Sequence, residues 1–199
     1  PGHMWMPLLT GAHVSTDAAL VAGRARWWRH AIGDARANGT FDHWRVEAKS
    51  RFRLEARLGA WTRKHLRGYT GIVNIETIGG VIIEAHLRLT DQWPDLYGPG
   101  WVDSVIALHA EGRWRFRECP RRDGFSVVLF GPHGKTYAHP RAKDVDAVRA
   151  MPGVSSVQIT FDPRKPPEAH SMPPGGFRLA VVNAWSLAAG RRARARFKH

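Results

Sequence analysis

The sequence predicts an α+β fold built on an antiparallel or mixed sheet with flanking helices. Glycine-containing dipeptides at three places separate short apolar runs of strand length, which is typical of β-hairpins. Other stretches carry apolar residues at the three-and-four spacing of a helix. Strands and helices interleave, but the frequent hairpins favour this class over a doubly wound parallel sheet.

The first half of the chain contains the three hairpin signals. Ala22-Gly23 and Asn38-Gly39 separate strand-like pieces within residues 11–49. Residues 50–67 place apolar side chains near helical spacing and predict an amphipathic helix that ends at Gly68. The stretch GYTGIVNIETIGGVIIEAHLRL then predicts two strands around Gly79-Gly80.

The second half follows a turn-rich connector, DQWPDLYGPG. Apolar spacing and turn signals predict, in order, a helix over 101–114, a buried strand over 125–131, a short helix at about 143–150, a strand through Val157 and Ile159, a strand in FRLAVVNA, and a final helix from Trp185. HSMPPGG, residues 170–176, is the most loop-like stretch.

Length and composition indicate a soluble globular protein. The chain has 199 residues, 43% of them hydrophobic, and can bury a sizeable core. Cys119 is the only cysteine, so an internal disulfide and a cysteine-based zinc site are excluded. There is no apolar run of about 18 residues and no signal-peptide pattern. We therefore expect a cytoplasmic protein that does not bind membranes.

We expect three segments along the chain. The opening PGHM resembles a cloning scar, so residues 1–9 are interpreted as a scar and an N-terminal tail. Residues 10–190 form a single α+β domain, and residues 191–199 form a basic tail. GRRARARFKH, residues 190–199, is interpreted as a solvated helix end or frayed tail, with a nucleic-acid contact as the alternative.

The charge balance points to an anionic partner. Thirty Lys and Arg against 17 Asp and Glu give a net charge of +13, which suits nucleic acid, a phosphate-rich ligand or an acidic protein. The excess of Arg also follows from a GC-rich genome. In RWWRH, residues 26–30, aromatic rings stand among basic residues, as in single-stranded nucleic-acid binders. Alternation places Trp27 on one face and Trp28 on the other, so half of this set belongs to the core.

The stretch GGVIIEAHLRL, residues 79–89, combines a buried pattern with an ordered polar row. Val81, Ile83, Ala85, Leu87 and Leu89 fall on one face of a strand. Glu84, His86 and Arg88 fall on the other, each about 7 Å from the next. This order of carboxylate, imidazole and guanidinium indicates a candidate site.

The turn decides whether Glu76 joins this row. A two-residue Gly79-Gly80 turn pairs Glu76 with Ile83 and puts the two carboxylates on opposite faces. A three-residue loop that includes Val81 pairs Glu76 with Glu84 on one face. We prefer the three-residue loop, because the alternative leaves Glu84 without a partner among apolar side chains.

Two facing carboxylates about 5 Å apart repel each other unless a positive charge lies between them. Mg²⁺ suits this position, since it takes one or two carboxylates and commonly bridges to nucleotide phosphates. Arg88 lies further along the same face, where it could contact a phosphate. In the alternative interpretation Arg88 only neutralises Glu84 and the row is structural.

The same stretch resembles the closing hairpin of the ATP-grasp fold, where a strand that ends in a metal-binding Glu precedes a strand reading Glu-x-Asn-x-Arg. The resemblance implies that Glu76 and Glu84 bind the metal and that Arg88 contacts phosphate or an acyl-phosphate. His86 stands where the family has the Asn that completes metal coordination. In GAHVSTDAALVAGRARWWRH, which resembles the preceding strand pair, His13, Arg29 and His30 are candidates to flank the nucleotide.

The resemblance covers only the C-terminal half of an ATP-grasp ligase. It implies an ATP-dependent carboxylate–amine ligase that forms an acyl-phosphate, with ATP and Mg²⁺ as cofactors and a small-molecule substrate. His86 in place of Asn makes Mn²⁺ an alternative to Mg²⁺, because imidazole favours softer ions. The missing N-terminal half would come from a second chain or from a longer protein.

A second hypothesis is a non-catalytic basic module that binds nucleic acid or an acidic protein. Phosphate-backbone binding weakens steeply with ionic strength. A metal–nucleotide site instead depends on a divalent ion and on Glu84.

Overall fold

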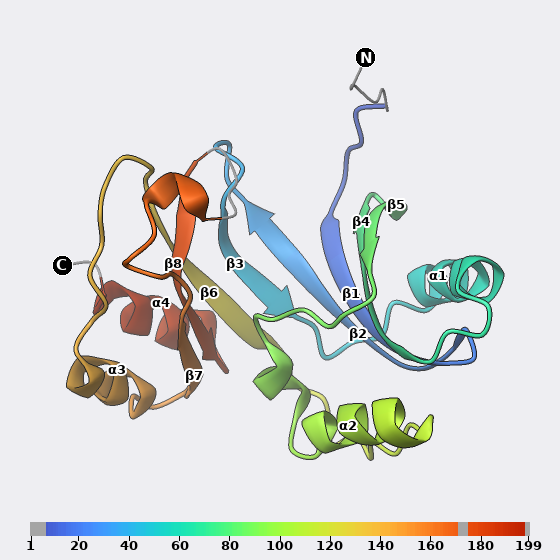
Figure 1. The fold of residues 1–199 in the computed structure, drawn as a ribbon. Coiled ribbons are helices and arrows are strands. Elements are labelled where there is room, and N and C mark those ends of the chain that lie inside the picture. Colours follow the sequence, from blue (N-terminus) through green and yellow to red (C-terminus); the bar gives the residue numbers. More distant parts are fainter. Residues whose placement is uncertain (1–6, 171–174, 198–199) are drawn as a thin grey trace.

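A single antiparallel sheet organises the molecule (Figure 1). The computed structural model describes residues 7–170 and 175–197. In these ranges the eight-stranded sheet has the order β5-β4-β1-β2-β3-β6-β8-β7. The strands are β1 (His13–Val21), β2 (Arg24–Ala35), β3 (Phe41–Val46), β4 (Gly71–Ile78), β5 (Val81–His86), β6 (Gly124–Gly131), β7 (Val154–Ile159) and β8 (Phe177–Ala184). The predicted α+β class is confirmed.

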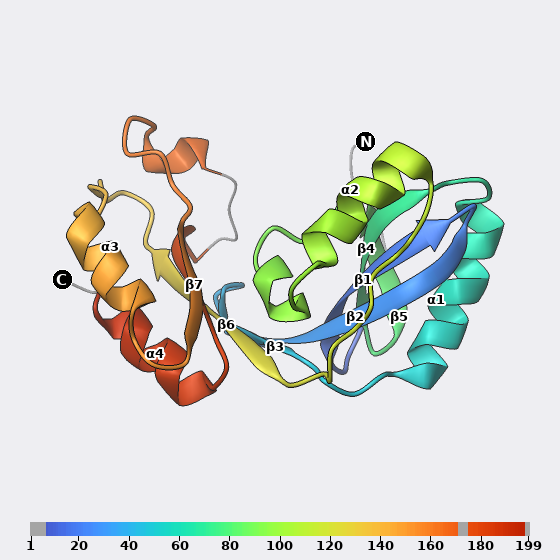
Figure 2. The same cartoon turned by 90° about the horizontal axis from the view of Figure 1, so that it is seen from below.

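The helices lie on both faces of the sheet. They are α1 (Phe52–His65), α2 (Trp101–Glu111), α3 (Ala142–Arg149) and α4 (Leu187–Ala195), with 3-10 turns η1 (Pro94–Tyr97) and η2 (Pro167–Ala169). Figure 2 shows α1 and α2 on opposite sides of the β1–β2–β4 region, while α3 and α4 lie against the β6–β8–β7 end. We call the face under α2 and η1 the front face and the face under α1 the back face.

Alternation along the strands divides the core between these faces. On β1, Ala19 packs in the front cluster with Trp27, Trp101 and Leu108, where α2 and η1 cover the sheet. Its neighbours Ala18 and Leu20 pack in the back cluster with Leu58 of α1. A third cluster joins β7 and β8 to α3 and α4 through residues such as Val182, which the strand register places on the back face.

The predicted hairpin signals are confirmed. Ala22 and Gly23, at φ 50° and 77°, connect β1 to β2, and Gly79 and Gly80, at φ 57° and 82°, connect β4 to β5. Glycine adopts this left-handed region at little cost, which explains its place in these two-residue turns. Asn38-Gly39 lies in the turn between β2 and β3, where Asn38 also accepts a hydrogen bond from the Thr40 backbone.

The predicted three-residue loop before β5 is wrong, but the pairing that it was meant to explain is confirmed. Ile78 pairs with Val81 across a two-residue turn, and Glu76 nevertheless pairs with Glu84. A register shift between Glu76 and Thr77 reconciles these facts, because Ile83 is an extra residue on β5. This β-bulge moves Glu84 to the face of Glu76.

The buried apolar face predicted for residues 81–89 is also wrong. β5 is the edge strand of the sheet and ends at His86, so Arg88 lies beyond it. Val81 and Leu87 are 41% and 60% exposed. Ile82, rather than Ile83, packs against the cluster under α1, as the bulge requires.

The C-terminal helix extends further than a tail at residues 191–199 would allow. α4 runs to Ala195, Ser186 caps its start by accepting a hydrogen bond from Ala189, and Arg194 is buried. Residues 191–195 are therefore part of a packed helix. Residues 1–6, 171–174 and 198–199 lie outside the described ranges, and so do most of the predicted N-terminal scar, the centre of the predicted 170–176 loop and the chain end.

In the ranges that the structure describes, no helix is long and apolar enough to cross a membrane.

Candidate functional site

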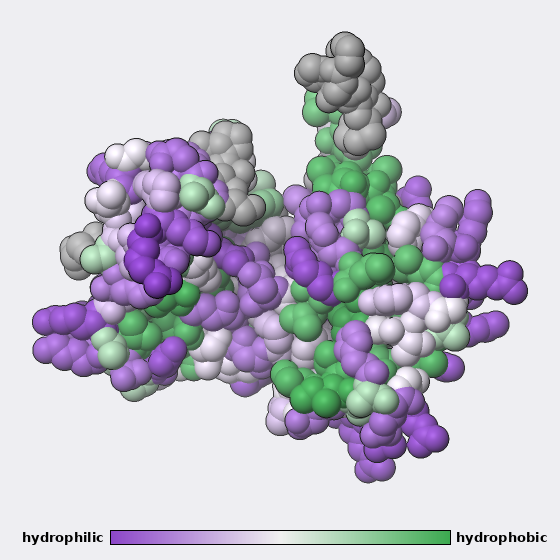
Figure 3. All heavy atoms as spheres, viewed as in Figure 1, coloured by the Kyte–Doolittle hydropathy of each residue, from purple (hydrophilic) through white to green (hydrophobic). Residues whose placement is uncertain are grey.

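A groove of about 950 Å³ on the front face brings together most of the predicted site residues. Four of them, His13, Glu76, Glu84 and Arg88, line this groove. Figure 3 shows the surface hollowed between the β7–β8 side and the β4–β5 side of the molecule. The other lining residues come from β3, β6, β8 and the loops: Gly39, Phe41, Trp44, Leu89, Asp91, Gln92, Val128, Phe130, Thr160, His170 and Arg178.

Three neighbouring strands position the acidic centre of the groove. Ser15 of β1 pairs with Glu76 of β4, which pairs in turn with Glu84 of β5. Directly opposed residues share a face, with Cβ atoms about 5 Å apart. The two carboxylates therefore share one face of the sheet, as predicted, and both line the groove.

Each of these carboxylates has a histidine beside it. His13 Nε2 lies 2.6 Å from Glu76 Oε2, and both side chains are 21% exposed. His86 Nε2 lies 3.2 Å from Glu84 Oε2. The His13 ring also packs edge-on against Phe41 and Trp44, at centroid distances of 5.4 and 5.3 Å. These aromatic contacts hold His13 against Glu76.

His86 does not line the groove. It belongs to the next row of the sheet, where Asp17, Asn74 and His86 are paired across β1, β4 and β5. Asn74 donates to Ser15 Oγ at 2.8 Å and to Asp17 Oδ1 at 2.7 Å. His86 therefore reaches the acidic centre only through Glu84.

A buried network around Asp17 supports this row. Asp17 accepts hydrogen bonds from Asn74, from the Thr90 backbone and from the Tyr97 hydroxyl at 2.9 Å. Burial raises the pKa of Asp17 to about 6, and these hydrogen bonds offset part of the increase. The network connects β1 to η1 and to the segment that follows Arg88.

Two of the cations in the groove differ in their partners. Among the described residues, Arg88 Nη1 donates only to the adjacent Leu89 carbonyl, at 3.0 Å, and its side chain is exposed. Arg178 forms an ion pair with Asp91 at 2.5 Å. Burial alone would raise the pKa of Asp91, but the hydrogen bonds and charge of Arg178 outweigh it and lower that pKa.

Other predicted candidates lie elsewhere. Arg29 is buried on the front face, where it donates to the Arg122 carbonyl at 3.0 Å and lies 3.6 Å from Glu118. His30 points to the back face, between Thr16 and Glu55. Neither residue lines the groove.

Sequence reasoning missed Asp91, Arg178 and His170 as groove residues. Asp91 lies in the connector after β5, and Arg178 and His170 come from a segment about 80 residues further along the sequence. The alternation of FRLAVVNA would have assigned Arg178 to one face of a strand. No local signal indicates which distant strand that face opposes.

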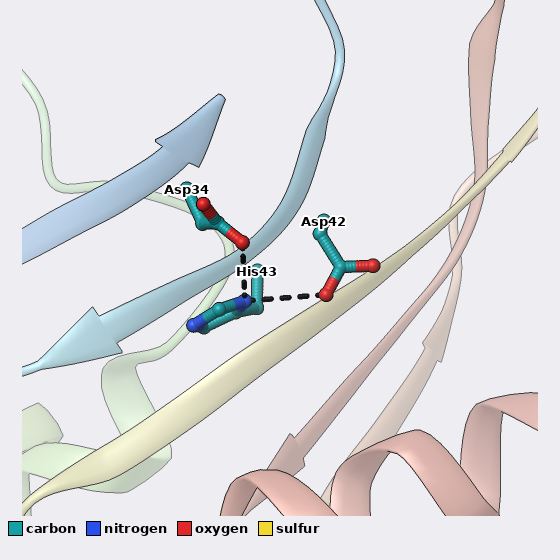
Figure 4. A group of neighbouring side chains, drawn as sticks. All are labelled: Asp34, Asp42 and His43. Atoms are coloured by element: carbon teal, nitrogen blue, oxygen red, sulfur yellow. Dashed lines mark hydrogen bonds and ion pairs between the residues drawn. The ribbon is translucent and has the colours of Figure 1, made fainter. Parts of the chain in front are cut away.

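A second cluster, Asp34, Asp42 and His43, has the donor types of a metal site (Figure 4). His43 Nδ1 lies 3.4 Å from Asp34 and 3.3 Å from Asp42. Asp42, however, also binds Arg36 at 2.5 Å, Arg191 at 2.8 Å and Arg194 at 2.8 Å, so three guanidinium groups occupy its oxygens. This cluster is an arginine-bound carboxylate rather than a cation site.

Comparison with known proteins identifies the class of fold. No protein-family model and no curated protein sequence matches the chain. Solved structures do match. L-amino acid ligase from Bacillus licheniformis aligns with a TM-score of 0.64 and 9% identity, over 94% of this chain and 50% of that one.

Two other solved structures give similar matches. The phosphoribosylaminoimidazole carboxylase ATPase subunit from Aquifex aeolicus has a TM-score of 0.54 and 14% identity, over 93% of this chain and 57% of that one. Phosphoribosylglycinamide synthetase from Anaerococcus prevotii has a TM-score of 0.58 and 11% identity, over 93% of this chain and 51% of that one.

These structures are ATP-grasp carboxylate–amine ligases, so the chain has an ATP-grasp-like fold. At this identity the likeness is one of fold. The chain spans about half the length of the solved structures that it matches.

Proposed function

We propose that this chain is the metal- and phosphate-binding half of an ATP-dependent carboxylate–amine ligase. Glu76 and Glu84 would hold a divalent ion, Mg²⁺ or Mn²⁺, and Arg88 would bind the phosphates of ATP. The observation that carries this proposal is the pairing of Glu76 with Glu84 across the β4–β5 bulge. This pairing points two carboxylates into one groove of an ATP-grasp-like fold.

The donor set suits a hard divalent ion. Glu76 and Glu84 are both partly exposed, and within the described ranges neither forms an ion pair with Lys or Arg. Their partners are His13 and His86, and a divalent ion, with its two charges, would compete with these histidines for the carboxylate oxygens. An ion held by the two carboxylates would neutralise charge on the phosphates of ATP.

The residues of the chain have distinct roles in this proposal. His13, held by Phe41 and Trp44, keeps Glu76 oriented toward the groove. His86 positions Glu84 from the neighbouring row. Arg88, whose guanidinium has no carboxylate partner among the described residues, is available to bind phosphate oxygens with its fork of donors. Arg88 is the side chain that we propose as catalytic, stabilising charge on the transferred phosphoryl group.

The proposal includes a second component. Each matched ligase is about twice as long as the aligned region. We propose that the remaining half, from a second chain or a longer form of this protein, closes over ATP and supplies the substrate pocket. That half would also set the substrate class.

Calorimetric titration tests the metal–nucleotide site directly. Mn²⁺ or Mg²⁺ is titrated first, followed by ATP, into the wild-type protein and the Glu84→Gln variant. We expect divalent-dependent ATP binding to the wild type and a loss of about tenfold or more in Glu84→Gln, because one of two charged ligands is removed.

Glu111→Gln is the matched control, since Glu111 is 44% exposed against 49% for Glu84 and lies on α2, outside the lining of the groove. Equal binding by the wild type and Glu84→Gln would contradict the proposed ligand pair. If neither Mg²⁺ nor Mn²⁺ promotes ATP binding to the wild type, this chain does not bind the metal–nucleotide complex on its own, and the proposed role of the groove is contradicted.

A further inference from the structure

We propose that the back face around α1 binds single-stranded nucleic acid, at a site separate from the groove. The surface consists of seven exposed cations on α1, at its C-terminal end and at the start of β2, together with two aromatic rings, and we call it the α1 basic face. Its cations are Arg24, Arg26, Arg53, Arg57, Arg63, Lys64 and Arg67, and its rings are Trp28 and Phe52.

The charge on this face is uncompensated. Within the described ranges none of the seven cations forms an ion pair, whereas twelve other arginines do. The one carboxylate on α1, Glu55, is only 16% exposed and is bound by His30 at 3.0 Å and by the Arg51 backbone. Most of the positive potential of this face is therefore left for a ligand.

An ordinary solvated helix would look different. Such helices usually alternate charge so that residues four apart attract each other. Here Arg53 and Arg57 repel across one turn, and no acidic residue follows Glu55 on α1. Like charges at this spacing destabilise a helix, which indicates that the basic surface is retained for binding.

The cations border a shallow groove with an aromatic wall. A depression of about 410 Å³ lies between β2 and α1, lined by Arg24, Arg26, Arg63, Trp28 and Phe52, with Ala25, Glu55, Ala56 and Gly59. Gly59 lies close to two of these side chains, since a Cβ there would lie 3.3 Å from Arg63 Nη1 and 3.8 Å from the Trp28 ring. Figure 3 shows long hydrophilic side chains projecting on the α1 side of the molecule.

Phe52 adds an exposed aromatic ring to the α1 basic face. It is the first residue of α1 and is 79% exposed, although its neighbours are charged. Exposing an apolar ring to water is unfavourable, but a ring that lies among arginines can stack on an unpaired base. Cations that follow a phosphate backbone and rings that stack on bases together fit a single strand better than a duplex, whose bases are already stacked, or an acidic peptide.

Fluorescence anisotropy with a labelled oligothymidylate of about 15 nucleotides tests this proposal. Titrations in EDTA, from about 50 to 200 mM salt, give the affinity and its salt slope. We expect the triple variant R24Q/R26Q/R63Q to bind at least about tenfold more weakly and to lower the slope by about 2, since each lost phosphate contact contributes about 0.7 on a single strand.

The matched control is R113Q/R117Q/R192Q, which removes the same charge from exposed arginines outside the α1 basic face. Phe52→Ala is expected to weaken binding by about five- to tenfold with an unchanged slope, because stacking is not ionic. Circular dichroism and thermal unfolding confirm that each variant is folded. Glu84→Gln is expected to bind the oligonucleotide like the wild type, so this proposal and the proposed ligase site fail separately.

Three outcomes would overturn the proposal. Equal losses in the two triple variants would show that net charge, and not this face, drives binding. Equal or tighter binding of a duplex of the same length, unaffected by Phe52→Ala, would remove the single-strand assignment. Poly-glutamate that displaces the oligonucleotide at equal charge concentration would indicate an acidic protein partner instead.

Discussion

Two nearly buried carboxylates, Asp17 on β1 and Asp42 on β3, lie in opposite electrostatic environments. Their exposures are 1% and 8%. In the part of the chain that the structure describes, Asp17 receives hydrogen bonds from neutral groups only, and burial raises its pKa to about 6. Burial also acts to raise the pKa of Asp42, but Arg191, Arg194 and Arg36 outweigh it and hold that pKa well below its ordinary value.

The comparison shows that the partner, more than the depth of burial, sets the charge. Asp42 stays ionised because removing its charge would leave Arg194, only 10% exposed, without a counterion. Asp17 has donors that suit a carboxylate but, among the described residues, no cation in hydrogen-bond contact, so burial disfavours its ionised form. Asp42 is therefore a clamp between β3 and α4, whereas Asp17 is a titratable group that supports the row of residues next to the groove.

The largest expected effect is on the clamp. Asp42→Ala removes the counterion of buried Arg194 and the attachment of α4 to β3, and we expect the free energy of unfolding to fall by about 3–5 kcal/mol. Urea unfolding at neutral pH, followed by circular dichroism, measures this change. Asp34→Ala is the control, because Asp34 is 58% exposed and, among the described residues, forms an ion pair only with His43; its cost should stay below about 0.5 kcal/mol. Similar losses in both variants would contradict the clamp.

The next effect concerns Asp17 and depends on pH. A folded-state pKa of about 6, above the ordinary 3.8, means that protonated Asp17 stabilises the fold and that this contribution is lost as pH rises through 6. Relative to Asp17→Asn, the wild type should therefore lose about 2–3 kcal/mol of stability between about pH 4 and pH 7.5. Unfolding free energies across this range give the difference, and the exposed Asp103→Asn should run parallel to the wild type. A flat difference for Asp17→Asn would contradict the raised pKa.

The sequence could predict elements whose signals are local. Glycine at Gly23, Gly39 and Gly80 marks turns that need a left-handed residue, and the three hairpins follow. The periodicity of residues 50–67 likewise predicted α1 within two residues at each end. The partners of Asp17 and Asp42 could not be predicted, because Tyr97 and Arg194 lie 80 and 152 residues away.

The facing carboxylates of the candidate site were predicted from a turn that the structure does not contain. The pairing of Glu76 with Glu84 was correct, but it depends on a bulge at Ile83 rather than on a longer turn. Ile82 and Ile83 are the same residue type, so the sequence gives no sign of which one is extra. The edge position of β5 could not be predicted either. Apolar residues such as Leu87 predict a buried strand, but they do not show that no further strand lies beside β5.

The smallest effect concerns the donor that links Asp17 to η1. Tyr97 donates to Asp17 at 2.9 Å and accepts from Trp93 Nε1 at 2.9 Å, so Tyr97→Phe leaves a buried indole N–H without its acceptor. We expect a cost of about 1–2 kcal/mol at pH 7.5. The lost hydrogen bond favoured ionised Asp17, so its pKa should rise further and the cost should shrink toward pH 4.5, where Asp17 is protonated in both proteins. Tyr137→Phe, at a half-buried tyrosine outside this network, is the control. A Tyr97→Phe cost that stays constant with pH would contradict this link, because it would mean that the hydroxyl supports Trp93 and does not affect the pKa of Asp17.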